Sequence, residues 1–168
     1  MDERLAVDEP GVEIVLPEVK IGLFPAWGGS QRLPRLVGLH HAIDIICGGA
    51  PVAARRAAEL GLVFDAVSRD VLLEEGRRII GWLSEDDRYR QLRADRRAPM
   101  GLSDDQAHFS FAVAAGQVML KTKGQYPAPL AALESMQQGL NLPLAEGLEV
   151  EKACARQIVG SEVSSNMI

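Results

Sequence analysis

The pattern of apolar residues changes near residue 70 of this 168-residue chain. Before that point, short β-branched or alternating runs are separated by Gly and Pro, as in strands joined by turns. Beyond it, apolar residues recur every three or four positions, as on the buried face of a helix. We therefore expect a mixed α/β portion over residues 1–69 and an all-helical portion over residues 70–168, in a chain long enough to bury a core.

Two short strands are expected first, over Arg4–Asp8 and Gly11–Val15, and the turn between them suggests a β-hairpin or a sheet edge. A helical pattern then begins at Gly28 and stops at the glycine pair 48–49. Pro34 falls inside it and is expected to end or kink its first turns, since proline lacks the N–H that a helix interior needs. A further helix is expected over Ala53–Leu60, and a short strand follows it at residues 62–64 and 67.

The second portion shows a clear helix start. Ser103 is followed three residues later by Gln106, which is the spacing of a capping box. Apolar residues at helical spacing predict further helices around residues 72–83, 107–118, 130–140 and 148–159. The run from residue 85 to residue 97 mixes both signs of charge, which is typical of a solvated helix face.

Composition excludes several classes of function. The net charge of -5 argues against nucleic acid or an anionic membrane as a default partner, although a few local cations can still hold an anionic ligand. No apolar stretch approaches the ~20 residues of a membrane span, and the charged start predicts no signal peptide. The two cysteines lack paired spacing, and the three histidines have no ligand partner at recognisable spacing. We expect a cytoplasmic protein without disulfides or a metal site.

The segment LPEVKIGLFPAWGGSQRLPR, residues 16–35, carries the candidate chemistry. It sets Glu18 at the end of a strand among apolar residues, where desolvation would raise the pKa of the carboxyl and suit it to proton transfer. By itself, a Glu beside a Pro is more often a surface or capping residue. Gly28 and Gly29 open a helix and have the alternatives of phosphate contact or a tight turn, but neither Rossmann nor P-loop spacing is present, which favours the turn.

The same segment is similar to the most recognisable motif of the enoyl-CoA hydratase/isomerase, or crotonase, family. The similarity continues through residues 37–38, 42–47 and 57–63. Residues 121–129 and 147–151 resemble the end of the hydratase region in multifunctional fatty-acid β-oxidation enzymes, whose alpha subunit continues into a 3-hydroxyacyl-CoA dehydrogenase. The resemblance implies the C-terminal part of a crotonase-like ββα spiral followed by a helical segment. It also implies a 2-enoyl-CoA thioester substrate, whose oxyanion two backbone N–H groups hold.

Within this resemblance, Glu18 matches the second of two family glutamates, the one that transfers a proton at the α-carbon. The first glutamate and both oxyanion donors would lie upstream of Met1, so we expect them to be absent from these residues. Pro25 and Ala26 stand where the family has Pro-Gly, and the backbone N–H at position 26 is expected to contact the catalytic water. Ala tolerates a positive φ poorly, which places the geometry of this turn in question.

The other substrate-binding candidates are Trp27, Lys121 and Lys123. Trp27 has two alternatives, to line the acyl pocket or to pack against the following helix. The lysines match a position from which they would meet CoA phosphates, although solvated surface lysines are the commoner case. No cofactor is expected beyond coenzyme A as part of the substrate.

Three hypotheses follow. The first is a β-oxidation hydratase or isomerase of 2-enoyl-CoA with Glu18 as acid/base. The second is a truncated, inactive crotonase fragment or oligomerisation module, and the third is another crotonase chemistry such as double-bond isomerisation or decarboxylation. In each case we expect exposed apolar surface to drive association, either as a homo-oligomer or with a complementary crotonase half.

Overall fold

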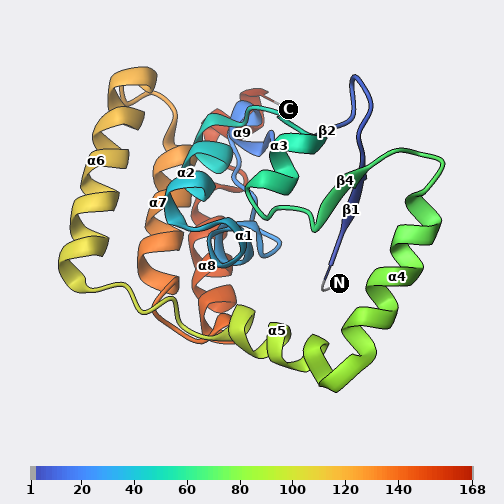
Figure 1. The fold of residues 1–168 in the computed structure, drawn as a ribbon. Coiled ribbons are helices and arrows are strands. Elements are labelled where there is room, and N and C mark those ends of the chain that lie inside the picture. Colours follow the sequence, from blue (N-terminus) through green and yellow to red (C-terminus); the bar gives the residue numbers. More distant parts are fainter. Residues whose placement is uncertain (1–2, 168) are drawn as a thin grey trace.

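The computed structural model describes residues 3–167, and its strands form two small sheets (Figure 1). Strand β1 (Leu5–Val7) pairs in parallel with β4 (Asp65–Val67), and β2 (Glu13–Ile14) pairs antiparallel with β3 (Val52–Ala53). The predicted hairpin is therefore wrong. The turn at residues 9–12 sends the chain to a second sheet, because each of the first two strands finds its partner after the helices that follow.

Helices account for most of the remaining chain. Their bounds are η1 Glu18–Ile21, α1 Gly29–Val37, α2 Leu39–Gly48, α3 Ala54–Glu59, α4 Leu72–Ser84, η2 Glu85–Asp87, α5 Arg88–Arg97, α6 Asp104–Thr122, α7 Pro127–Gly139, α8 Leu144–Ile158 and α9 Glu162–Met167. The capping box that starts α6 is confirmed, with Ser103 Oγ accepting from Gln106 N at 3.2 Å and Ser103 N donating to Gln106 Oε1 at 3.1 Å. Among the described helices, none is long and apolar enough to cross a membrane.

Pro34 does not end α1. The helix continues to Val37 and stops at Gly38, which has a φ of +82° and donates its N–H to Pro34 O at 2.9 Å. The proline ring is fully buried, so packing offsets the one hydrogen bond that its missing N–H removes. The break between α1 and α2 is therefore set by a glycine, not by the proline.

Of the strand expected at residues 62–64 and 67, only Val67 lies in β4, because Leu62, Val63 and Phe64 form a bend before the strand begins at Asp65. Leu62 and Val63 fill the core, while their backbone N–H groups both donate to Ala57 O at 2.8 and 3.3 Å. Phe64 N then donates to Arg4 O at 2.7 Å, which starts the ladder between β4 and β1. The apolar run reflected burial and not an extended backbone, a distinction that periodicity alone does not make.

Helix α7 lies at the centre of the helical layer and packs against α1, α2, α6 and α8 (Figure 1). Its buried face includes Ala128, Ala132 and Met136, which are fully enclosed. One hydrophobic core contains residues from both sides of residue 70, from Ala6 to Ile158. The α/β part and the helical part therefore share a core.

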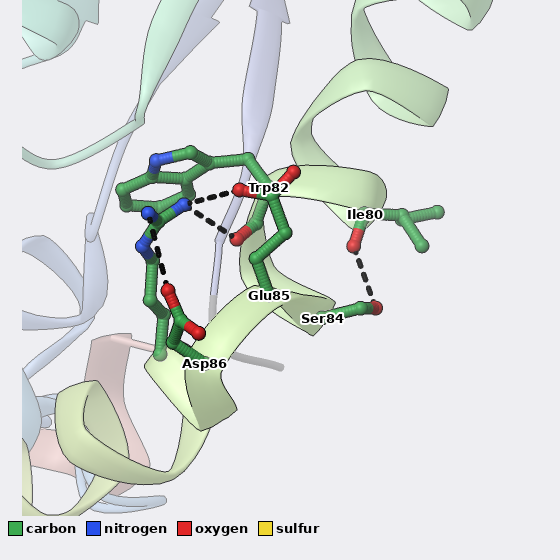
Figure 2. Close-up of polar contacts among 6 residues, drawn as sticks. Ile80, Trp82, Ser84, Glu85 and Asp86 are labelled. Atoms are coloured by element: carbon green, nitrogen blue, oxygen red, sulfur yellow. Dashed lines mark hydrogen bonds and ion pairs between the residues drawn. The ribbon is translucent and has the colours of Figure 1, made fainter.

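A sharp elbow joins α4 to α5. Asp86 and Asp87 have φ values of 50° and 56°, a left-handed conformation that Asp tolerates better than most residues. Arg88 Nη1 donates to Trp82 O at 3.1 Å and to a Glu85 carboxylate oxygen at 2.9 Å, and its guanidinium lies 5.2 Å from the centre of the Trp82 ring. Figure 2 shows Trp82, Glu85 and Asp86 gathered on one side of this bend. The elbow turns α5 back toward α1 and α8.

Candidate active site

Glu18 opens the short helix η1, which residues 15–17 join to the end of β2. Val19 is buried beside it and anchors this turn in the core. Gly22 ends the turn with a φ of +73°, and a Cβ there would lie 3.0 Å from Ser164 Cα, so helix α9 packs directly on the end of η1. The turn that carries the candidate carboxylate is therefore held from both sides, by the core and by the C-terminal helix.

The side chain of Glu18 faces a cavity of about 380 Å³. The cavity is otherwise lined by Leu16, Leu23, Phe24, Pro25, Ala26, Trp27, Gly29, Ala155, Ile158 and Val159. Glu18 is the one ionisable residue among these lining residues, and its Oε2 atom is buried without a hydrogen-bond partner in the described part of the chain. A buried polar atom without a partner costs free energy, and such atoms gather at functional sites. The arrangement can bind an apolar group beside a carboxylate that is available for proton transfer.

The turn at Pro25 and Ala26 forms one wall of this cavity. Pro25 O accepts a hydrogen bond from Ser30 N at 3.1 Å, and a Cβ on Gly29 would lie 2.4 Å from Pro25 Cβ. Only glycine at position 29 therefore allows the turn to fold onto the start of α1. Ala26 is not among the described non-glycine residues with positive φ, so replacing a family glycine by alanine does not strain the backbone here.

Trp27 lies at the mouth of the cavity, and its side chain is fully exposed, at 102% relative accessibility. It does not pack against the following helix, and its contact with an acyl chain stays a prediction. The two lysines lie elsewhere: Lys121 and Lys123 are exposed at the C-terminal end of α6, and neither lines the Glu18 cavity. Their contact with CoA phosphates stays a prediction.

A second carboxylate, Glu151, is buried behind the same turn, and the sequence analysis did not single it out. Helix α8 brings it to the start of α1, where Oε1 accepts from Gly28 N at 2.5 Å and Oε2 accepts from Ser30 N at 2.9 Å and Ser30 Oγ at 2.5 Å. The N-terminus of a helix favours negative charge, which explains why a carboxylate is tolerated there. The carboxylate of Glu151 therefore occupies the place that a phosphate would take at Gly28 and Gly29. Of the two alternatives for this glycine pair, phosphate contact and a tight turn, the structure supports the tight turn.

A small polar cluster extends this contact into the helical layer. Ser30 Oγ lies 2.8 Å from Ser135 Oγ on α7, and Gln31 Nε2 donates to Ser135 O at 2.7 Å. Burial raises the pKa of the Glu151 carboxyl above its ordinary value, against the opposing hydrogen bonds from Ser30, Gly28 and Gln31. One signal was present in the sequence: Glu151 falls on the apolar face of the helix marked by Leu148 and Ala155.

A histidine pair and a cysteine on α2 are the remaining candidates for metal binding or reactivity. Among the described residues, His40, His41 and Asp44 form the one group of potential ligand atoms within 4.8 Å of one another, and it lies largely exposed at the start of α2. His40 and Asp44 are exposed, as expected of polar surface residues, with His40 Nε2 3.6 Å from an Asp44 oxygen, and His41 is half-buried. Burial, and secondly Asp44, raise the pKa of the Cys47 thiol to about 12, which disfavours the thiolate form.

Taken together, the fold and the site define an α/β protein with one unpartnered carboxylate in an apolar cavity beside a glycine-rich helix start. Residues 2–125 match the family model for enoyl-CoA hydratase/isomerase. The chain belongs to the enoyl-CoA hydratase/isomerase family, which confirms both the resemblance of residues 16–35 and the α/β class.

Curated relatives extend this result. The chain is 34% identical over 163 residues to the fatty acid oxidation complex subunit alpha of Vibrio vulnificus (strain CMCP6), and 36% identical over 163 residues to that of Vibrio campbellii (strain ATCC BAA-1116). In both cases the match covers 97% of this chain and 23% of the relative. The chain therefore spans about a quarter of the length of these relatives.

Solved structures are also similar. A crystal structure of enoyl-CoA hydratase from Bacillus anthracis is 24% identical, with a TM-score of 0.44, and the match covers 96% of this chain and 47% of that one. A second, described as enoyl-CoA hydrates from Geobacillus kaustophilus HTA426, is 24% identical with a TM-score of 0.45, and the match covers 98% of this chain and 47% of the other.

Proposed function

We propose that this protein acts on 2-enoyl-CoA thioesters in fatty-acid β-oxidation, by hydration or isomerisation, with Glu18 as acid/base. Two observations on Glu18 carry the proposal: the residue lines an apolar cavity, and its buried Oε2 atom has no hydrogen-bond partner in the described chain. The matching family and the names of the fatty acid oxidation relatives support the substrate class.

Each wall of the cavity has a task in this reaction. The apolar side chains accept the acyl chain and exclude bulk water, which strengthens electrostatic interactions at the carboxylate. Glu18 transfers a proton at the α-carbon, and the backbone N–H of Ala26, on the cavity wall, orients the attacking water in the hydration reaction. In double-bond isomerisation the same carboxylate moves a proton between carbons without the water.

A hydratase of this kind also needs a second glutamate and an oxyanion hole. Among residues 3–167, no second carboxylate lines the Glu18 cavity. We propose that the missing groups come from residues outside the printed sequence or from a complementary chain. Losing even one oxyanion donor typically slows a reaction by about 100-fold to 1,000-fold, so these residues alone would be close to inactive. This observation favours the alternative, an inactive crotonase fragment or oligomerisation module.

The test follows the enoyl thioester chromophore of crotonyl-CoA, with Glu18→Gln as the variant and Glu13→Gln, on the exposed strand β2, as the matched control. The proposed enzyme loses its turnover with Glu18→Gln and keeps it with Glu13→Gln. If neither the chain alone nor the chain supplied with a complementary crotonase half consumes crotonyl-CoA, the alternative stands.

Association is part of the same proposal, either as a homo-oligomer or with a complementary half. Exposed apolar side chains on α6 support it, since Phe109 and Leu120 are 71% and 83% accessible. Light scattering on the purified chain tests this, and a clean monomer at high concentration would count against it. A cytoplasmic location fits the two free cysteines, Cys47 and Cys154.

A further inference from the structure

Five arginines surround a cavity of about 210 Å³ on the side of α1 that faces α5. The residues that line it are Arg4, Arg32, Leu36, Arg93, Arg96, Arg97 and Leu144. This concentration of positive charge stands out in a chain whose net charge is -5. No acidic side chain is among the residues that line it.

Three separate elements bring these arginines together. Arg4 precedes β1, Arg32 lies on α1, and the other three lie on one face of α5, at the spacing of three and four residues that makes helix neighbours. Helix α5 reaches this place because of the elbow after α4, where Arg88 is bound by Trp82 and Glu85 (Figure 2). The cluster is therefore a product of the tertiary fold.

The described contacts leave much of this charge uncompensated. Glu3 pairs with Arg96 at 2.6 Å, and Arg4 Nε donates to Leu62 O at 3.0 Å. Arg93 and Arg96 have further interactions, so the argument rests on the other three arginines. Within residues 3–167, no carboxylate oxygen lies within 4.0 Å of the guanidinium of Arg32 or Arg97. Burial, and secondly Arg96, lower the pKa of the Arg4 guanidinium, against an opposing effect of Glu3.

We propose that this arginine-lined cavity binds a phosphate group. A guanidinium presents paired N–H donors that match the spacing of phosphate oxygens, and arginine is favoured over lysine where such two-point binding is needed. The cavity holds a phosphate and its first attached atoms but not a folded peptide. Binding of inorganic phosphate there does not depend on the proposed function.

A further cavity of about 250 Å³ suggests how a larger phosphate compound would lie. It shares Arg4, Arg32 and Leu36 with the arginine-lined cavity, and it shares Leu16, Trp27 and Gly29 with the Glu18 cavity. The three cavities therefore adjoin one another, in the order that a ligand with a phosphate at one end and an apolar group at the other would occupy. This extension, unlike the phosphate site itself, rests on the proposed function.

Isothermal titration calorimetry tests the site with two probes, inorganic phosphate and adenosine 3′,5′-bisphosphate, at constant ionic strength set with chloride. Arg32→Ala and Arg97→Ala each remove charge-assisted hydrogen bonds and should weaken binding by about 10-fold or more. Arg77→Ala, which removes an exposed arginine of α4 outside the cavity, is the matched control and should bind as the unaltered chain does.

Two results support the proposal and separate the sources of the phosphate. Binding of both probes indicates a site for free phosphate, whereas binding of the bisphosphate alone indicates a phosphate carried by a nucleotide-like ligand. Failure of both probes to bind, or equal binding by all three variants, would overturn the proposal. Because Arg32 and Arg97 are exposed, circular dichroism of the variants should match that of the unaltered chain, so a loss of binding is not a loss of folding.

Discussion

At the scale of single residues, two carboxylates are buried for different reasons. Glu18 keeps a buried oxygen without a partner, whereas each carboxylate oxygen of Glu151 accepts hydrogen bonds at the start of α1. An unpartnered buried group costs stability and a fully paired one contributes to it. The two sites should therefore respond in opposite ways when the carboxylate is replaced by an amide of the same shape.

Replacing Glu18 with Gln should leave the free energy of unfolding unchanged or raise it by up to about 1 kcal/mol, because an unpartnered charge is removed. Urea denaturation of both forms measures this difference. Glu13→Gln serves as the exposed control and should have no effect. A loss of several kcal/mol in Glu18→Gln would mean that the carboxylate has a structural partner, which would weaken its assignment as acid/base.

Replacing Glu151 with Gln should lower the free energy of unfolding by about 1.5–3 kcal/mol, because both oxygens of Glu151 accept hydrogen bonds and an amide nitrogen cannot accept one. The effect should depend on pH. Since folding raises the pKa of Glu151, its contribution is fully present below the unfolded pKa, near 4.5, and is lost as pH rises through the folded pKa.

The stability gap between the unaltered chain and Glu151→Gln should therefore narrow as pH is raised from about 4.5 through that window. Urea denaturation at a series of pH values measures it, with Glu149→Gln, an exposed residue of the same helix, as the control. A gap that widens with pH would show that the hydrogen bonds to Glu151 outweigh its burial.

At the scale of elements, close approach of α1, α7 and α8 depends on two glycines. A Cβ on Gly139 would lie 2.5 Å from Gln31 Oε1, and one on Gly147 would lie 2.7 Å from the same atom. Such distances are too short for any Cβ, and the Gln31 side chain cannot move without losing its hydrogen bond to Ser135 O. These positions require glycine for space and not for an unusual backbone angle.

Gly139→Ala should destabilise the fold by about 1–3 kcal/mol, as overpacking of a closed core does. Gly76→Ala is the matched control, because Gly76 lies inside α4 with no atom within 4 Å of its added Cβ. That change should stabilise α4 by about 0.5–1 kcal/mol, since alanine favours the helix. Thermal unfolding measures both variants, and the midpoint should fall for Gly139→Ala and rise for Gly76→Ala. An unchanged midpoint for Gly139→Ala would show that the helices can separate.

Elements were predictable to the extent that they depend on neighbours in the sequence. The capping box of Ser103 and Gln106 was predicted because both residues belong to one helical turn. Of the two effects expected of Pro34, to end or to kink the helix, the first was wrong, since α1 continues to Val37 with the proline buried. The strand expected at residues 62–64 and 67 was wrong for its first three residues, because Leu62 and Val63 are buried in a bend, and right for Val67, which lies in β4.

At the scale of the whole molecule, the helical part completes the core of the α/β part. Residues of α7 and α8 contact α1, and Glu151 on α8 binds the start of α1. The cavity around Glu18 likewise takes Ala155, Ile158 and Val159 from the end of α8 and just beyond it. The candidate site is thus shared by both portions of the chain.

A chain ending at Leu142, without α8 and α9, should fail to fold cooperatively, because it loses the Glu151 contacts and part of the core. Urea unfolding followed by circular dichroism and by tryptophan fluorescence tests this, with the 168-residue chain as reference. The reference should show one coincident transition in both probes. A stable, cooperative product from the shorter chain would show that the first portion is an independent domain.

The sequence alone was enough to identify the family, the Glu18 turn and most of the helices, because motifs, caps and helical periods are set by residues a few positions apart. It did not reveal that β1 pairs with β4, that Glu151 binds Gly28 across 123 positions, or that α5 brings its arginines to Arg4 and Arg32. Those contacts form only when distant segments bury their apolar faces against one another. Their partners are therefore chosen by packing and not by local spacing.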